Sequence, residues 1–291
     1  MPEEIEIETP SGMRAARVWG PLDAPAVLAL HGWLDNAASF DHIAPRMPGV
    51  RVVALDLPGH GLSEHAPAGQ LYPFVGYVAV VHEVAAALGW DSFCLLGHSL
   101  GAAVASIYAG TFPDRVRRLA LIEGLGPLAE DAKHAPERLA KAIAQDTGKQ
   151  GRRIPVYPSI EEVERKRLAA AWTMKPASVR TLLARGLKPT AGGVTWRSDP
   201  ALKVASRMRL TEAQVLAFLQ AIRCPTLLVR GDTGFPFVPA DDGPRVQAVA
   251  DLKIEALTGG HHLHLDEPEA VSAALNAFFA PQVTPEGPDD A

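Results

Sequence analysis

Short apolar runs alternate with longer amphipathic stretches along most of the chain. Residues 4–9 and 13–20 alternate apolar and polar side chains, which is typical of two strands in an antiparallel hairpin. After this hairpin the pattern changes to short, mostly apolar runs, as expected of strands buried on both faces of a parallel sheet. These runs cover residues 26–32, 51–56, 93–99, 118–124, 225–231 and 252–257.

The stretches between these runs have the apolar spacing of helices that cover a sheet, most clearly at residues 77–89, 101–113 and 267–279. Strands and helices that alternate in this way form repeated βαβ units with right-handed crossovers. The pattern therefore predicts an α/β fold with a mostly parallel, eight-stranded sheet flanked by helices.

One connection is far longer than a crossover helix requires, since about 100 residues separate Glu123 from the strand that begins at Pro225. Its amphipathic segments predict helices, one of them with Ser159 as its N-cap. We expect a helical cap at residues 126–210, inserted after the sixth strand of a core formed by residues 1–125 and 211–280. The arginines around residues 152–209 are expected on the solvated outer face of the cap. The acidic, proline-rich tail, residues 281–291, is expected to be disordered.

Composition narrows the classes of function. The 291 residues are 47% hydrophobic and carry a net charge of −5 with no basic stripe, so a large core is expected and nucleic acid is not an expected partner. No window approaches the ~18 apolar residues of a membrane span, and the acidic start lacks the features of a secretory signal. Cys94 and Cys224 fit buried thiols in a reducing compartment. We therefore expect a cytoplasmic protein without a membrane span, whose oligomeric state the sequence does not indicate.

The segment LLGHSLGAAVA, residues 95–105, places Ser99 between two glycines, after an apolar strand and before a run of small residues. Glycine at both positions permits the sharp strand-to-helix turn that exposes a nucleophilic serine. A serine hydroxyl needs a base to remove its proton. His261, which follows the glycines at the end of the last predicted strand, lies in a loop at the same carboxyl edge of the sheet as Ser99. We expect His261 to be this base, with His262 and His264 in packing roles.

A metal site is the alternative for this histidine-rich segment. HLHLD, residues 262–266, matches the H-x-H-x-D core of a metallo-β-lactamase zinc site. Residue 267 is glutamate where that family has histidine, and no further histidine or cysteine set follows it. We therefore expect no metal at this motif and no cofactor.

The oxyanion that forms on an attacked carbonyl needs two hydrogen-bond donors already in position. The backbone N–H of Leu100, directly after the serine, is one candidate. The backbone N–H of Trp33, in the HGW segment after an earlier strand, is the other. His31 and His98 flank these donors, and we expect them to orient the site rather than to transfer protons.

These motifs together resemble the α/β-hydrolase fold superfamily. HGWLDNAASFDHIAP, RVVALDLPGHGLS, LLGHSLGAAVAS and CPTLLVRG resemble in particular the serine hydrolase-like family within it, over residues 15–280. The resemblance implies a Ser99 nucleophile, a His261 base and an acid between them in chain order.

Two carboxylates are candidates for the acid that holds the histidine. Many α/β-hydrolases carry it after the seventh strand in a G-x-x-D pattern, whose last position is Gly234 here; Asp232 lies two residues earlier. Some haloalkane dehalogenases and related enzymes carry it after the sixth strand, which corresponds to Glu123. Because a carboxylate at the end of an apolar run is costly to bury unless it is paired, we favour Glu123.

A serine at the turn, where dehalogenases and epoxide hydrolases of this fold have aspartate, points to acyl transfer. We expect a carboxylesterase-type serine hydrolase that cleaves a medium-sized, largely apolar ester or lactone. The substrate would contact Trp33, Trp172, Trp196 and Phe235. Carbon–carbon bond hydrolysis, cofactor-free perhydrolysis and slow-turnover ligand perception remain alternatives on the same fold.

Overall fold

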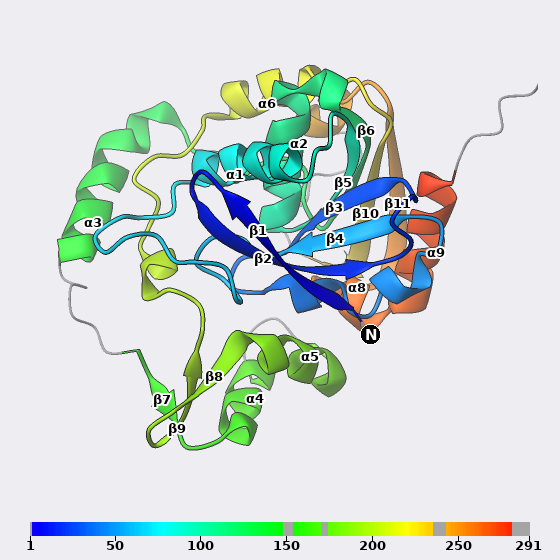
Figure 1. Ribbon diagram of the computed structural model, residues 1–291. Coiled ribbons are helices and arrows are strands. Elements are labelled where there is room, and N and C mark those ends of the chain that lie inside the picture. The colour runs from blue at the N-terminus through cyan, green and yellow to red at the C-terminus, as the bar shows by residue number, and fades with distance from the viewer. Residues whose placement is uncertain (1, 148–153, 170–173, 235–242, 281–291) are drawn as a thin grey trace, which may run out of the picture.

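A computed structural model of the chain describes residues 2–147, 154–169, 174–234 and 243–280. Its centre is an eight-stranded sheet with the order β1-β2-β4-β3-β5-β6-β10-β11 (Figure 1). The strands are β1 (Glu3–Thr9), β2 (Gly12–Trp19), β3 (Ala26–Leu30), β4 (Arg51–Leu55), β5 (Phe93–His98), β6 (Val116–Ile122), β10 (Thr226–Thr233) and β11 (Leu252–Gly260). All eight predicted strands are confirmed.

Only the first strands of this sheet run antiparallel. β1 pairs with β2, and β2 pairs with β4, in antiparallel register. From β4 onward the strands β4, β3, β5, β6, β10 and β11 pair with one another in parallel register. The carboxyl ends of β3, β5, β6 and β11 therefore reach the same edge of the sheet, which brings together loops that are far apart in the sequence.

Helices cover both faces of the sheet, as the apolar strands require. Along β3, Leu28 and Leu30 belong to one buried cluster, whereas Val27 and Ala29 belong to the cluster on the opposite face. The first cluster includes residues of α1 (Phe74–Ala87), α2 (Leu100–Thr111) and α6 (Glu212–Gln220), and the second includes residues of α9 (Pro268–Phe279). The predicted arrangement, a mostly parallel sheet flanked by helices, is confirmed.

The long segment between β6 and α6 contains helices α3 (Ala135–Thr147), α4 (Ile160–Leu168) and α5 (Pro176–Gly186). Ser159 caps α4 as predicted, because its hydroxyl accepts from the backbone N–H of Glu162. The last predicted helix of the segment, α6, packs with the core through Val215 and Leu219. We keep residues 126–210 as the proposed cap.

A small antiparallel sheet in this segment was not predicted. It has the order β7-β9-β8, formed by β7 (Val156–Tyr157), β8 (Leu187–Thr190) and β9 (Gly193–Trp196). These strands are too short to show a two-residue period in the sequence. The turn between β8 and β9 depends on Gly193, whose φ is +139° and where a Cβ would lie 2.0 Å from the Tyr157 carbonyl oxygen.

The expectation that the cap arginines face solvent is wrong for Arg185. Its side chain is buried against the core, where Nε donates to Asp56 Oδ2 over 2.9 Å and Nη1 donates to both carboxylate oxygens of Glu4 over 2.7 Å. A guanidinium buried in this way needs fixed carboxylate partners. Arg185 therefore attaches α5 to the loop after β4 and to the first strand, which no local sequence pattern reveals.

Some expectations fall outside the described residues, namely the disorder of residues 281–291 and the positions of Trp172 and Phe235. Cys94 and Cys224 are both buried and are not joined by a disulfide. Within the four described ranges, no helix combines the length and the apolar character needed to cross a bilayer.

Candidate active site

Ser99 occupies a strained turn between β5 and α2. Its φ is +52° and its ψ is −110°, a region that side chains other than glycine seldom adopt and that costs on the order of 1–3 kcal/mol. The two flanking glycines make the turn possible. A Cβ at Gly97 would lie 2.5 Å from the Ala102 nitrogen, and a Cβ at Gly101 would lie 1.9 Å from the Leu30 carbonyl oxygen.

His261 follows β11 and lies between Ser99 and Glu123. Its Nε2 is 3.0 Å from Ser99 Oγ, and its Nδ1 is 3.2 Å from Glu123 Oε2. An ionised carboxylate only accepts hydrogen bonds, so Nδ1 carries the proton and the Nε2 lone pair faces the serine hydroxyl. In this tautomer the histidine is oriented to remove the proton of Ser99.

Glu123 directly follows β6, and its carboxylate is fully buried. Its second oxygen, Oε1, accepts the backbone N–H of Gly231 over 2.7 Å. The backbone of Glu123 has a φ of +56°, which turns the side chain from the end of β6 toward the histidine loop. The residue therefore has a strained backbone and fixed partners, as expected of a group held in place for function.

Asp232 lies in β10 and is engaged elsewhere. Its Oδ1 accepts the backbone N–H of Gly259 over 2.9 Å and so joins β10 to β11. Of the two acids considered from the sequence, Glu123 is the one for which the structure describes a hydrogen bond with His261.

The loop after β3 presents Trp33 at the same edge of the sheet. The carbonyl of Gly32 accepts from the Asp35 N–H over 3.1 Å and lies 2.7 Å from His31 Nδ1. Because the C=O and N–H of one trans peptide point in opposite directions, the Trp33 N–H faces away from these partners. Leu100 begins α2, so its N–H has no partner within the helix. The Trp33 N–H is therefore not directed at the partners of the Gly32 carbonyl, and the Leu100 N–H makes no hydrogen bond within α2.

His31 and His98 make the orienting contacts that the sequence suggested. His31 Nε2 accepts the Leu57 N–H over 3.0 Å, and burial lowers the pKa of His31 to about 4. His98 Nε2 lies 2.9 Å from the carbonyl oxygen of His261 and therefore donates to it. Burial, followed by the neighbouring histidines, lowers the pKa of His98 well below its usual value. Both imidazoles are neutral and hold the loops that carry Trp33 and His261.

The other predicted residues of the segment after β11 are packed. His264 Nε2 lies 2.8 Å from Ser39 Oγ, and His262 Nε2 lies 3.2 Å from Asp35 Oδ2. Trp196, expected to line the substrate site, packs against an apolar cluster formed by residues of the proposed cap together with Leu265 of α8 (Leu263–Asp266). Its part in substrate binding stays a prediction.

The side chain of Trp33 is 53% exposed and its indole N–H donates to the Leu202 carbonyl over 3.3 Å.

Sequence reasoning did not single out Asp35, which links three parts of the site. Its Oδ1 accepts from Arg167 of α4 over 3.0 Å, and its Oδ2 contacts His262. Burial raises the pKa of Asp35, but His262 and, to a smaller extent, Arg167 together bring this pKa well below its usual range. The polar pair Asp35 and Asn36, shortly after the HGW motif, was the local sequence signal for this role. The partners of Asp35, however, lie more than 100 residues away in the sequence.

Comparison with known proteins places this geometry in a family. Residues 25–268 match the α/β hydrolase fold family. A probable serine hydrolase of Drosophila melanogaster is 33% identical, covering 95% of this chain and 87% of the fly protein. A hypothetical protein of Pseudomonas aeruginosa PAO1 of known structure is 41% identical with a TM-score of 0.91, covering 96% of this chain and 99% of that one. The thioesterase domain of the curacin biosynthetic pathway is 26% identical with a TM-score of 0.84, covering 95% and 99%.

Proposed function

Because the chain belongs to the α/β hydrolase fold family and is similar to serine hydrolase-like proteins, we propose that it hydrolyses carboxylic esters through an acyl-enzyme on Ser99. The observation that supports this most strongly is the continuous chain of contacts from Ser99 Oγ to His261 Nε2 and from His261 Nδ1 to Glu123. The same arrangement of nucleophile, base and orienting acid performs acyl transfer on unrelated folds.

In the first half of the reaction, Ser99 Oγ attacks the ester carbonyl while His261 Nε2 takes the hydroxyl proton. Glu123 stabilises the imidazolium that forms. The negative charge on the former carbonyl oxygen is stabilised by the N–H groups of Trp33 and Leu100, and the second of these also lies at the positive end of α2. The alcohol then leaves with the proton from His261, and Ser99 retains the acyl group.

In the second half, water attacks the acyl group. His261 Nε2 removes a proton from this water, and the tetrahedral intermediate uses the same two N–H donors. Ser99 leaves as the alkoxide and recovers its proton from His261, so the free carboxylic acid is released. The reaction needs only groups of this chain and water, in keeping with the expectation of no cofactor.

The substrate class in this proposal is a medium-sized, largely apolar ester or lactone. The half-exposed side chain of Trp33 supports it, since a large apolar surface beside the oxyanion loop favours an apolar acyl or alcohol group. The likeness to a thioesterase domain adds thioesters to the substrates worth testing, because their hydrolysis also passes through an acyl-serine.

Steady-state hydrolysis of p-nitrophenyl esters of graded acyl length, with matched thioesters and lactones, tests this proposal. We expect many turnovers by the wild type and none above background by Ser99→Ala. Ser106→Ala is the matched control in α2, because the Ser106 hydroxyl donates to the Ala102 carbonyl and accepts the Gly126 N–H, neither of which belongs to the proposed triad. A single turnover would instead indicate ligand perception, and faster cleavage of diketones than of esters would indicate carbon–carbon hydrolysis.

A further inference from the structure

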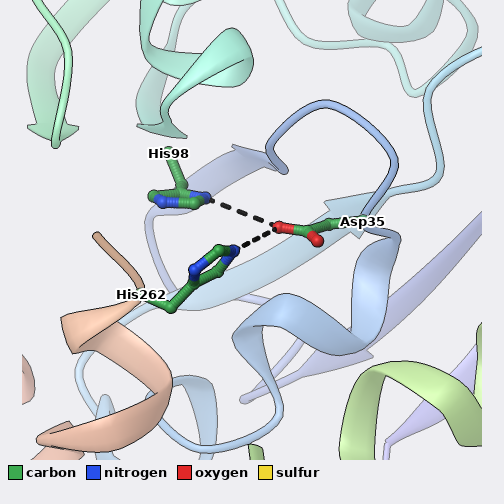
Figure 2. A group of neighbouring side chains, drawn as sticks. All are labelled: Asp35, His98 and His262. Atoms are coloured by element: carbon green, nitrogen blue, oxygen red, sulfur yellow. Dashed lines mark hydrogen bonds and ion pairs between the residues drawn. The ribbon is translucent and has the colours of Figure 1, made fainter. Parts of the chain in front are cut away.

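Three buried side chains outside the proposed triad converge next to it: Asp35 from the loop after β3, His98 at the end of β5, and His262 after β11 (Figure 2). One potential ligand atom from each residue lies within 4.8 Å of the other two. None of these side chains has a role in the proposed hydrolysis mechanism beyond the contact of His98 with the His261 carbonyl.

The hydrogen bonding of His98 leaves a lone pair directed at a carboxylate. A backbone carbonyl only accepts, so the contact of His98 Nε2 with His261 O places the proton of the neutral ring on Nε2. Its Nδ1 then carries a lone pair, lies 3.9 Å from Asp35 Oδ2 and has no hydrogen-bond partner among the described residues. Two electron-rich atoms that face each other in a buried site are favourable neighbours only when a cation or a donor lies between them.

His262 approaches the same carboxylate oxygen from another side. Its Nε2 is 3.2 Å from Asp35 Oδ2, and its Nδ1 also lacks a hydrogen-bond partner within the described ranges. Either nitrogen of a neutral imidazole can carry the proton. In the metal-free chain Nε2 carries the proton and donates to Asp35, because an ionised carboxylate only accepts. When an ion binds, the neutral ring instead carries its proton on Nδ1, and the Nε2 lone pair is directed at the point where the lone pairs of Asp35 and His98 also meet.

Glycine at position 32 keeps this point accessible. A Cβ on Gly32 would lie 2.9 Å from His98 Nδ1 and 3.1 Å from Asp35 Oδ2, so any other residue would intrude between these atoms. Two imidazole nitrogens and one carboxylate oxygen are ligands suited to Zn²⁺ and related divalent transition metals.

We propose that Asp35, His98 and His262 form a binding site for a divalent transition-metal ion. Ligand atoms of a tetrahedral zinc ion lie about 3.4 Å apart, given bond lengths of about 2.0–2.2 Å. The 3.2 Å and 3.9 Å separations on Asp35 Oδ2 are close to this value, and the remaining pair, which lies within 4.8 Å, requires the side chains to close by up to roughly 1.4 Å. Arg167 occupies the other oxygen of Asp35, which leaves Oδ2 for the ion.

This site differs from the one considered in the sequence. The HLHLD motif would require His262, His264 and Asp266 together. In the structure His264 instead contacts Ser39, and Asp266 accepts from Ser178. The proposed site takes one histidine from that motif and its other two ligands from the loop after β3 and from the last residue of β5.

Titration of the metal-free, full-length protein with Zn²⁺, in competition with a chromophoric chelator, tests the proposal. We expect one ion per chain, with the dissociation constant raised at least about 10-fold in His262→Gln. The matched control is the neighbouring triad histidine, and His261→Gln is expected to leave Zn²⁺ binding unchanged. Loss of binding in His261→Gln but not in His262→Gln would assign the ion to the triad and overturn the proposal.

A measurement on the unmutated protein covers the case in which His262→Gln does not fold. X-ray absorption at the zinc edge of the wild type with one equivalent of Zn²⁺ is expected to show scattering from two imidazole rings. The triad offers only His261, so a single imidazole, or no retained zinc, would contradict the proposed site.

Discussion

The carboxylate of Glu123 occupies the space into which a side chain at position 234 would project. A Cβ on Gly234 would lie 2.3 Å from Glu123 Oε1 and 2.4 Å from Oε2. The two positions at which relatives of this fold carry the acid therefore converge on one place beside His261. In this chain Glu123 reaches this place from the end of β6, and glycine at position 234 leaves room for the Glu123 carboxylate.

This convergence predicts that the acid can be moved between the two positions. Glu123→Gly should lower kcat by roughly 10³- to 10⁴-fold, as expected when the histidine loses the group that fixes its tautomer. Adding Gly234→Asp to Glu123→Gly should restore part of that loss, whereas Gly234→Asp alone should destabilise the protein. Ester turnover and thermal unfolding of the three variants test this, and a double mutant no more active than Glu123→Gly would contradict it.

Asp232 provides the contrasting case. Its carboxylate accepts the backbone N–H of Gly259 and so joins β10 to β11. We expect Asp232→Asn to change kcat by only a few-fold, because asparagine keeps an oxygen that accepts the Gly259 N–H. An activity loss as large as that of Glu123→Gln, measured on the same ester, would show that the acid assignment is wrong.

The attachment of the cap through Arg185 predicts a large effect on stability. Removing the guanidinium leaves Asp56 as a buried carboxylate without its ionic partner, although Asp56 keeps the N–H groups of Ala37 and Leu62. Arg185→Met should lower the free energy of unfolding by about 3–5 kcal/mol. Arg223→Ala, which removes an exposed pair with Asp114, should cost less than about 1 kcal/mol. Urea unfolding measures both, and similar costs would contradict the buried role of Arg185.

Buried histidines predict loss of stability in mild acid. Burial, followed by the neighbouring His31, lowers the pKa of His60 to about 3, below the unfolded value of 6.5. The unfolded chain therefore binds a proton on this group that the folded protein excludes, so stability is fully present above pH 6.5 and falls as the pH decreases toward 3. In His60→Gln the slope of the unfolding free energy with pH between 4 and 6 should decrease by up to about 1.4 kcal/mol per pH unit. An unchanged slope would contradict this.

Much of the fold follows from local pattern. The two-faced apolar runs and the spacing of the long helices are enough to predict the eight strands and the covering helices, because burial on both faces leaves a clear signature in the sequence. The Ser99 turn is also local, since its two glycines, its strand and its helix lie within about ten residues. The short hairpin β8–β9 is not, because four-residue strands carry too little periodic signal.

The parts of the site that depend on contacts between distant residues were harder to predict from the sequence. Glu123 could be favoured from the cost of burying a charge, but only the fold shows that Gly234 makes room for it. Local sequence reasoning places Arg185 with the solvated arginines of the proposed cap. Its burial depends on Asp56 and Glu4, which lie more than 100 positions away in the sequence. The convergence of Asp35, His98 and His262 likewise requires the loop after β3, the end of β5 and the segment after β11 to meet at one edge of the sheet.

Covalent labelling tests the central claim that His261 activates Ser99 as a nucleophile. The folded wild type is treated with a fluorophosphonate probe and analysed by intact mass and peptide mapping. We expect the mass of one probe, located on Ser99, with no label on Ser99→Ala and much slower labelling of His261→Gln. A wild type that is folded but unlabelled, or a Ser99→Ala variant labelled as fast as the wild type, would contradict the account.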